Sequence, residues 1–145
     1  MILKLSVFNR IIGDSGFELE FAAFLESCQD EIVSYAKNYF AVGFKLDYVN
    51  ADGNISNYYP DFFVKVSVQE VVIVETKGQE DLDVPLKMDR LKQWCDDINQ
   101  AQNAVHYDFV FVDEEGFKKY RPDTFAALMK SFCDYKLRIN EPLPH

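Results

Sequence analysis

The sequence predicts an α/β domain in which a mixed sheet is flanked by helices. Three observations predict this class: apolar residues at helical spacing from Phe17 to Tyr35, a run of four apolar β-branched residues at 71–74, and an element order α-β-β-β-α-β-α. The length of 145 residues is typical of one domain. We therefore expect a single domain over 1–145, with a linker or extra edge segment at 1–13 and a tail at 140–145.

The first helix is expected to begin near Phe17, after a capping residue at Asp14 or Ser15. Its apolar stripe comprises Phe17, Phe21, Phe24, Leu25 and Cys28, and Ile32 continues it toward Tyr35. Glu18 borders this stripe, so its carboxylate is expected at the edge of the packed face.

Three strands are predicted to follow. Segments 44–48 and 58–66, joined by a turn at 50–54, form a hairpin whose second strand contains Asp61. The apolar run 71–74 is typical of a central strand covered on both faces, and Glu75 and Lys77 lie at its end.

The second half of the chain predicts a helix, a strand and a closing helix. Asp83 and Pro85 mark the start of the helix, whose core stripe is Val84, Met88, Leu91, Cys95 and Ile98. A strand is expected at 107–112. The closing helix, over 122–135, carries Phe125, Leu128, Met129 and Phe132 on one face.

Composition restricts the function. The formal charge of −9 argues against nucleic-acid binding by bulk electrostatics alone, yet a nuclease remains allowed because its site must be acidic to hold a metal. No apolar run approaches the roughly 18 residues of a membrane span. The three cysteines form no CxxC motif, which favours buried thiols in a reducing cytoplasm.

One cluster carries candidate chemistry: Asp61, Glu75 and Lys77. Strand alternation points Glu75 and Lys77 to one face, and placing both charges at the end of a buried strand costs desolvation. A divalent cation between Asp61 and Glu75 would offset that cost, and Mg²⁺ prefers such carboxylate ligands. The backbone carbonyl of Thr76 is a further candidate ligand. Lys77 would orient or deprotonate the attacking water, or neutralise charge in the transition state.

The pattern Pro60-Asp61, then Glu75-x-Lys77, resembles the signature of the PD-(D/E)xK nuclease superfamily. Together with the segments 58–65 and 74–78, Lys87 and Trp94-Cys95, the chain from Phe17 to Val112 resembles the C-terminal endonuclease domain of type III restriction enzyme Res subunits. The resemblance implies a restriction-endonuclease-like fold and Mg²⁺-dependent hydrolysis of DNA phosphodiester bonds, with Mn²⁺ as a substitute. Asp61, Glu75 and Lys77 would be the catalytic residues.

Two further residues are weaker candidates. The resemblance implies a role for Glu18 as the extra acidic residue that assists metal binding, although its position in the first turn of a helix explains it equally well. Lys87 lies within the apolar stripe of its helix. Its ammonium would reach the site or the scissile phosphate, or would extend past the stripe to solvent.

The resemblance also implies partners. Type III enzymes carry an ATP-driven translocase before the nuclease, and this sequence has no GxxxxGK[ST] loop. The expected partners are DNA, an ATP-driven helicase or translocase domain or subunit, and a DNA-recognition or modification subunit. Two alternatives remain open: a catalytically silent docking or nucleic-acid-binding module of this fold, and a structure-specific or RNA-directed nuclease of this fold.

Overall fold

The computed structural model describes residues 16–38, 44–78 and 81–133. The predicted cap at Asp14 or Ser15, the segment 1–13 and the tail 140–145 lie outside these residues. In order, the elements are α1 (Gly16–Ser27), β1 (Ser34–Lys37), β2 (Leu46–Val49), β3 (Ile55–Tyr58), β4 (Phe62–Ser67), β5 (Glu70–Lys77), α2 (Val84–Ala101), β6 (His106–Asp113), α3 (Glu114–Tyr120) and α4 (Phe125–Ser131). The predicted α/β class, a mixed sheet flanked by helices, is confirmed.

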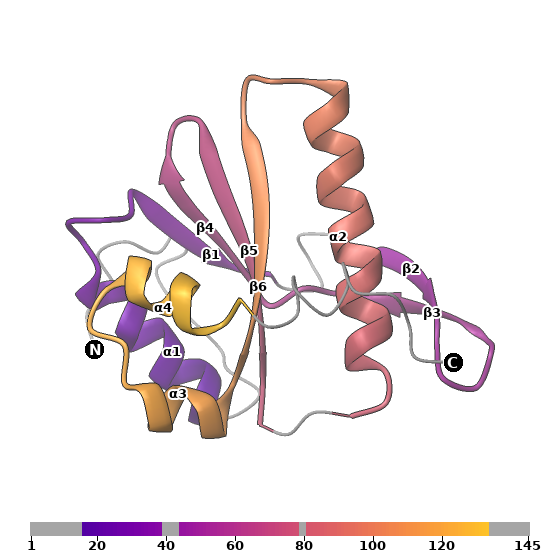
Figure 1. Ribbon diagram of the computed structural model, residues 1–145, viewed down its shortest axis with the longest axis horizontal. Helices are drawn as coiled ribbons and strands as arrows, with labels where there is room; N and C mark the ends of the chain where they lie inside the picture. Colours follow the sequence, from indigo (N-terminus) through magenta and orange to yellow (C-terminus); the bar gives the residue numbers. More distant parts are fainter. Residues whose placement is uncertain (1–15, 39–43, 79–80, 134–145) are drawn as a thin grey trace.

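The main sheet has the strand order β1-β4-β5-β6. β1, β4 and β5 pair antiparallel. β5 and β6 are parallel, and α2 connects them. β2 and β3 form a separate hairpin beside α2 (Figure 1). Because β5 lies between β4 and β6, its carboxyl end is central to the fold.

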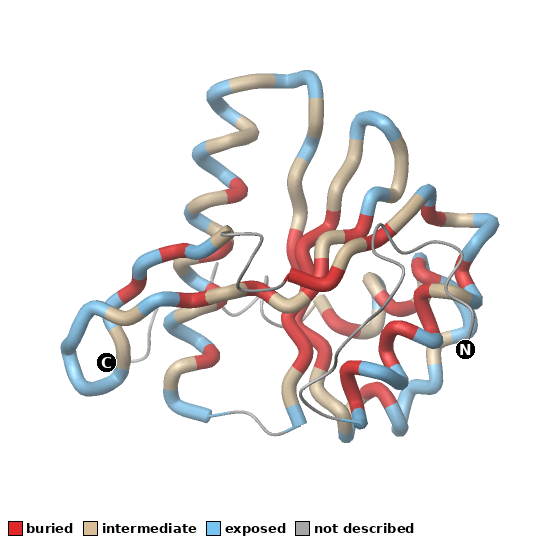
Figure 2. Tube along the Cα trace, turned by 180° about the vertical axis from the view of Figure 1, so that it is seen from behind, coloured by how far each residue is buried: buried red, intermediate tan, exposed pale blue. Residues whose placement is uncertain are grey.

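The helices divide between the two faces of the sheet. α1, α3 and α4 lie on one side, whereas α2 and the β2–β3 hairpin lie on the other (Figure 1). Val72 and Val74 of β5 pack in the core with α1, and Ile73 packs in the core with α2. Buried residues are concentrated in the middle of the sheet and in the helix turns that face it (Figure 2). We call these two sides the α1 face and the α2 face.

The first helix is shorter than predicted. It ends at Ser27, and Tyr35 belongs to β1, so the continuation of the helical stripe to Tyr35 is wrong. Ile32 and Tyr35 are nevertheless buried. The register pairs Tyr35 with Val64 and Lys37 with Phe62. Tertiary pairing with β4 therefore determines the conformation of this segment.

The predicted hairpin has different strands. Its first strand begins at Leu46, and the segment 58–66 is split, because β3 ends at Tyr58 and β4 begins at Phe62. Pro60 lies in this break and has no N–H to donate to a ladder. Asp61 consequently lies in the bend before β4, so its predicted position in the second hairpin strand is wrong.

The second half follows the prediction with two changes. α2 begins at Val84 as predicted, but Asp81 accepts hydrogen bonds from the N–H groups of Asp83 and Val84 at its start. α3 was not predicted; Asp113 caps it by accepting from the N–H of Gly116. α4 ends at Ser131, inside the predicted 122–135, and residues 134 and 135 lie outside the described residues. None of the helices described is long and apolar enough to cross a membrane.

Candidate active site

A pocket of about 300 Å³ lies at the carboxyl end of β5. It is lined by Glu18, Asn57, Tyr58, Tyr59, Asp61, Glu75, Thr76, Lys77 and Lys87. All six residues that the sequence singled out are among them. They come from α1, the bend before β4, β5 and α2, so that the fold brings together residues from widely separated parts of the chain.

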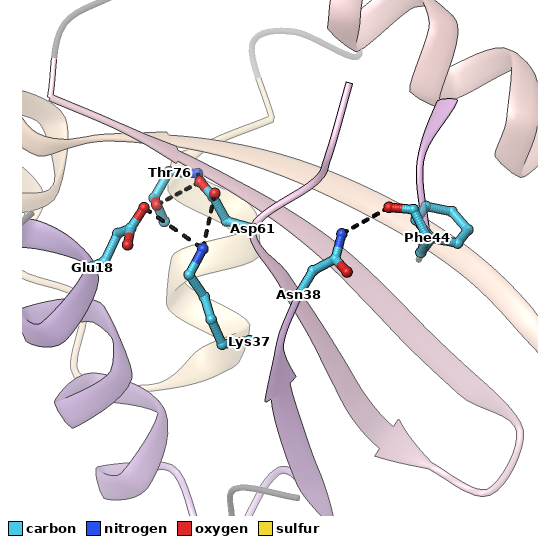
Figure 3. A network of polar contacts seen from close by, with 6 residues as sticks. All are labelled: Glu18, Lys37, Asn38, Phe44, Asp61 and Thr76. Carbon is cyan, nitrogen blue, oxygen red and sulfur yellow. Dashed lines mark hydrogen bonds and ion pairs between the residues drawn. The ribbon is translucent and has the colours of Figure 1, made fainter. Parts of the chain in front are cut away.

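Asp61 is held in place by the end of β5. Its Oδ2 accepts hydrogen bonds from the N–H and from Oγ1 of Thr76, both at 2.9 Å (Figure 3). Its Oδ1 lies 3.2 Å from Lys37 Nζ. Burial raises the pKa of Asp61, but hydrogen bonding with Glu75, the Lys37 ammonium and the bonds from Thr76 outweigh it, and the pKa is lowered. Asp61 is thus a carboxylate of fixed orientation.

Glu75 is buried and faces Asp61. Alternation along β5 places its side chain on the α2 face, whereas Thr76 points to the α1 face. Burial raises the pKa of Glu75 well above its ordinary value, and the nearby charge of Asp61 raises it further. Two carboxyl groups this close together disfavour simultaneous ionisation, and a cation between them would relieve the repulsion.

Lys77 lines the same pocket and forms an ion pair with Asp81. Its Nζ lies 3.0 Å from Asp81 Oδ2, and its side chain is 34% exposed. The hydrogen bond with Asp81 raises the pKa of Lys77 despite partial burial. Lys77 is therefore a partly exposed cation that lines the pocket, and its ion pair is with Asp81, before α2, rather than with Asp61 or Glu75.

Lys87 reaches the pocket from α2. Its Nζ lies 5.6 Å from the ring centroid of Tyr58 and 5.9 Å from that of Tyr48, and its charge lowers the pKa of Glu75. Tyr58 is fully buried, and burial together with the charge of Glu75 raises the pKa of Tyr58 well above its ordinary value. Lys87 thus lines the pocket, and its role in the chemistry stays a prediction.

Glu18 is linked to Asp61 by Lys37, which the sequence did not predict as a site residue. Lys37 Nζ lies 3.7 Å from Glu18 Oε1 and also contacts Asp61, as Figure 3 shows. Lys37 is only 5% exposed. In the sequence, Lys37 follows the helical stripe that we expected to extend toward Tyr35. The one sequence feature that could have indicated a strand here is the two-residue spacing between Tyr35 and Lys37, which puts both side chains on one face of a strand. The β1–β4 pairing brings it to Asp61.

The oxygen donors fit a hard cation such as Mg²⁺. Asp61 and Glu75 offer two facing carboxyl groups, and Mg²⁺ in proteins commonly takes one or two carboxylates with water and phosphate oxygens. Within the described residues, no group of three or more His, Cys, Asp or Glu side chains is arranged to hold a metal ion, so water and phosphate oxygens would have to complete the shell around Asp61 and Glu75. The Thr76 carbonyl as a ligand stays a prediction.

We compared the chain with protein-family models, with curated proteins and with solved structures, and none of them matched. The functional assignment therefore depends on the geometry of the site and on the sequence motif.

Proposed function

We propose that this protein is a metal-dependent endonuclease domain that hydrolyses phosphodiester bonds of DNA. The observation that carries the proposal is the meeting of Asp61 and Glu75 at one pocket with Lys77 and Lys87. Two carboxyl groups that need a cation, beside ammonium groups that could face a phosphate, form a chemically coherent site for phosphate-ester hydrolysis.

The order of the elements supports a restriction-endonuclease-like fold. If the β2–β3 hairpin is set aside, the chain runs α1, β1, β4, β5, α2, β6, followed by α3 and α4. With α3 and α4 counted together, this order supports the proposed order α-β-β-β-α-β-α, in which β1 takes the place of the predicted strand 44–48. The carboxylate pair lies at the start of β4 and the end of β5, and both strands are central in the sheet.

Each residue has a role in the proposed reaction. Asp61 and Glu75 would hold Mg²⁺, and the bound ion would supply a Lewis acid for phosphate oxygens. Lys77, as an ammonium, would contact the scissile phosphate and help to orient the attacking water, whose proton leaves to solvent, and Lys87 would contribute positive charge near Glu75. The water oxygen bonds to phosphorus, one P–O ester bond breaks, and the departing oxygen takes a proton, with no covalent enzyme intermediate.

The charge of the chain suggests that DNA must be delivered to the site. The chain has 15 Lys and Arg against 24 Asp and Glu, a formal charge of −9, so its overall charge repels DNA phosphates. We therefore expect weak DNA affinity and weak cleavage by the chain alone. We therefore propose that an ATP-driven helicase or translocase, as a domain or a subunit, supplies the DNA, and that a recognition or modification subunit selects it.

The test is nicking of supercoiled plasmid by the purified chain with Mg²⁺, Mn²⁺ or EDTA. Variants Asp61→Asn, Glu75→Gln and Lys77→Met should each abolish metal-dependent nicking. Lys92→Met is the matched control for Lys77→Met, because Lys92 forms the same kind of i,i+4 pair, with Asp96, outside the pocket. Nicking that survives in Asp61→Asn and Glu75→Gln would overturn the proposal.

A silent module of the same fold is the second candidate, favoured by the pairing of Lys77 with Asp81. A chain that binds no Mn²⁺ through Asp61 and cleaves neither plasmid, single-stranded DNA nor RNA would indicate this alternative, whereas Mn²⁺ binding through Asp61 without cleavage would indicate a nuclease domain that needs its motor. Cleavage of RNA only would instead indicate an RNA-directed nuclease.

A further inference from the structure

We propose that this site binds one divalent cation, on the α2 face, because the ammonium of Lys37 occupies the position between Glu18 and Asp61 that a second cation would need. The inference rests on the proposed function, since it concerns the metal of that site. It assigns Lys37 as a built-in cation and Glu18 as its counter-charge.

Lys37 lies between two carboxylates on the α1 face. Its Nζ is 3.2 Å from Asp61 Oδ1 and 3.7 Å from Glu18 Oε1. The side chains of Lys37, Asp61 and Glu18 are 6%, 15% and 11% exposed, so water screens these three charges little. The position between Glu18 and Asp61 is thus already occupied by one positive charge (Figure 3).

The acceptor positions of Asp61 allow one bond to a metal. A carboxylate offers about four lone-pair positions, two on each oxygen. The N–H and hydroxyl of Thr76 use both positions of Oδ2, and Lys37 uses one position of Oδ1. The remaining position, on Oδ1, is left for a ligand, and Glu75 lines the same pocket. A cation between Asp61 and Glu75 would take that position.

Displacement of Lys37 by a second cation would be unfavourable. Its ammonium lies 5.4 Å from the ring centroid of Phe62, and the residue is buried at the end of β1. A metal ion at this position would have to move a buried ammonium away from both of its carboxylate partners, and removing one member of such a buried cluster is costly. Glu18 is therefore a positioning residue that acts through Lys37.

The experiment is a titration of the full chain with Mn²⁺ in the absence of DNA. Calorimetry measures the heat of binding, and the electron paramagnetic resonance signal measures the concentration of free Mn²⁺. The wild type should bind one Mn²⁺. Glu18→Gln should also bind one, with a Kd changed by less than about tenfold, which is below the usual cost of losing a metal ligand or its support. Lys37→Gln should bind two, and the double variant Lys37→Gln/Glu18→Gln should return to one. Lys37→Arg keeps the charge and should bind one.

Three results would overturn the inference while leaving the proposed function intact. They are two Mn²⁺ in the wild type, loss of Mn²⁺ binding in Glu18→Gln, and a folded Lys37→Gln that still binds one. If Lys37→Gln does not fold, as judged by circular dichroism, the wild type and Glu18→Gln decide the question. A wild-type chain that binds no Mn²⁺ would instead remove the inference together with the proposed function.

Discussion

Asp61 and Thr76, fifteen positions apart in the chain, are joined by two hydrogen bonds to a single carboxylate oxygen. Oδ2 of Asp61 accepts from the main-chain N–H and from the hydroxyl of Thr76, each at 2.9 Å. The first bond fixes Asp61 to the backbone of β5, and the second fixes the rotation of its carboxylate. The carboxylate is therefore oriented whether or not a ligand is bound.

The hydroxyl bond can be removed separately from the main-chain bond. Thr76→Val keeps the shape of the side chain but removes the donor, so Asp61 gains rotational freedom. We expect a stability loss of about 1 kcal/mol and a loss of kcat of about 10- to 100-fold, as for other small misplacements of catalytic groups. Thr76→Ser keeps a hydroxyl and should stay near wild type. Equal activity of the Val and Ser variants would show that the main-chain bond suffices.

Glu75 should make the metal-free chain less stable as the pH rises. Burial, together with the charge of Asp61, raises the pKa of Glu75 well above its ordinary value of 4.5. A raised pKa contributes stability that is full below the unfolded pKa and is lost as the pH rises through the folded pKa. The free energy of unfolding should therefore fall from about pH 5 toward neutral pH, over a range in which Asp61, with its lowered pKa, stays ionised.

Glu75→Gln tests this pH dependence. The amide can still donate a hydrogen bond to Asp61 but cannot ionise, so the variant should be more stable than wild type at pH 8 by about 1–2 kcal/mol. Its stability should also depend less on pH. Urea unfolding between pH 5 and pH 8 in EDTA measures both effects, with the exposed Glu115→Gln as control. Parallel curves for wild type and Glu75→Gln would contradict the prediction.

The periodic parts of the fold could be predicted from the sequence. α1, β5, α2 and β6 each bury a stripe or run of apolar residues, and these patterns depend only on local spacing. β1 has four residues and α3 has seven, which is too short for a pattern to stand out. α3 begins directly after β6, where Asp113 serves as both the last strand residue and the cap.

The members of the candidate site that depend on local spacing or on the motif could also be predicted, whereas those that depend on strand register could not. Glu75 and Lys77 are two residues apart on one strand, so local alternation puts them on one face, and the motif added Asp61. Lys37 and Tyr58 reach the site only through the register of β1 with β4 and the placement of the β2–β3 hairpin. Strand register is a non-local property, which a single sequence without a clear alternating pattern specifies weakly.

Asp81 should restrain Lys77. Lys77 Nζ lies 3.0 Å from Asp81, which is half-exposed, so breaking the pair should change stability by less than about 1 kcal/mol. Asp81→Asn would free the Lys77 ammonium to turn toward a bound phosphate, and we expect kcat/KM to rise by up to about fivefold, the equivalent of that energy. Asp96→Asn, which breaks the pair of Lys92, is the control. Lower activity in Asp81→Asn would show that Asp81 instead holds Lys77 in its working position.

Lys87, on α2, should lower the pKa of Glu75 through its positive charge. Its ammonium lies near the rings of Tyr48 and Tyr58, and its charge lowers the pKa of Glu75. In Lys87→Met this charge is lost, so the pKa of Glu75 should rise further. Because Glu75 must be ionised to hold Mg²⁺, the rising limb of the pH–rate profile should shift to higher pH.

The same variant separates this electrostatic role from a structural one. Methionine keeps an unbranched apolar stem against the two rings, so the stability loss should stay near the 0.5–1 kcal/mol of a cation–π contact. At neutral pH kcat/KM should fall about tenfold, which corresponds to ~1.4 kcal/mol of lost transition-state stabilisation. Lys87→Arg should restore the position of the rising limb, because it restores the charge. A Lys87→Met profile that is lowered uniformly, without a shift along the pH axis, would mean that Lys87 acts on the phosphate and not on Glu75.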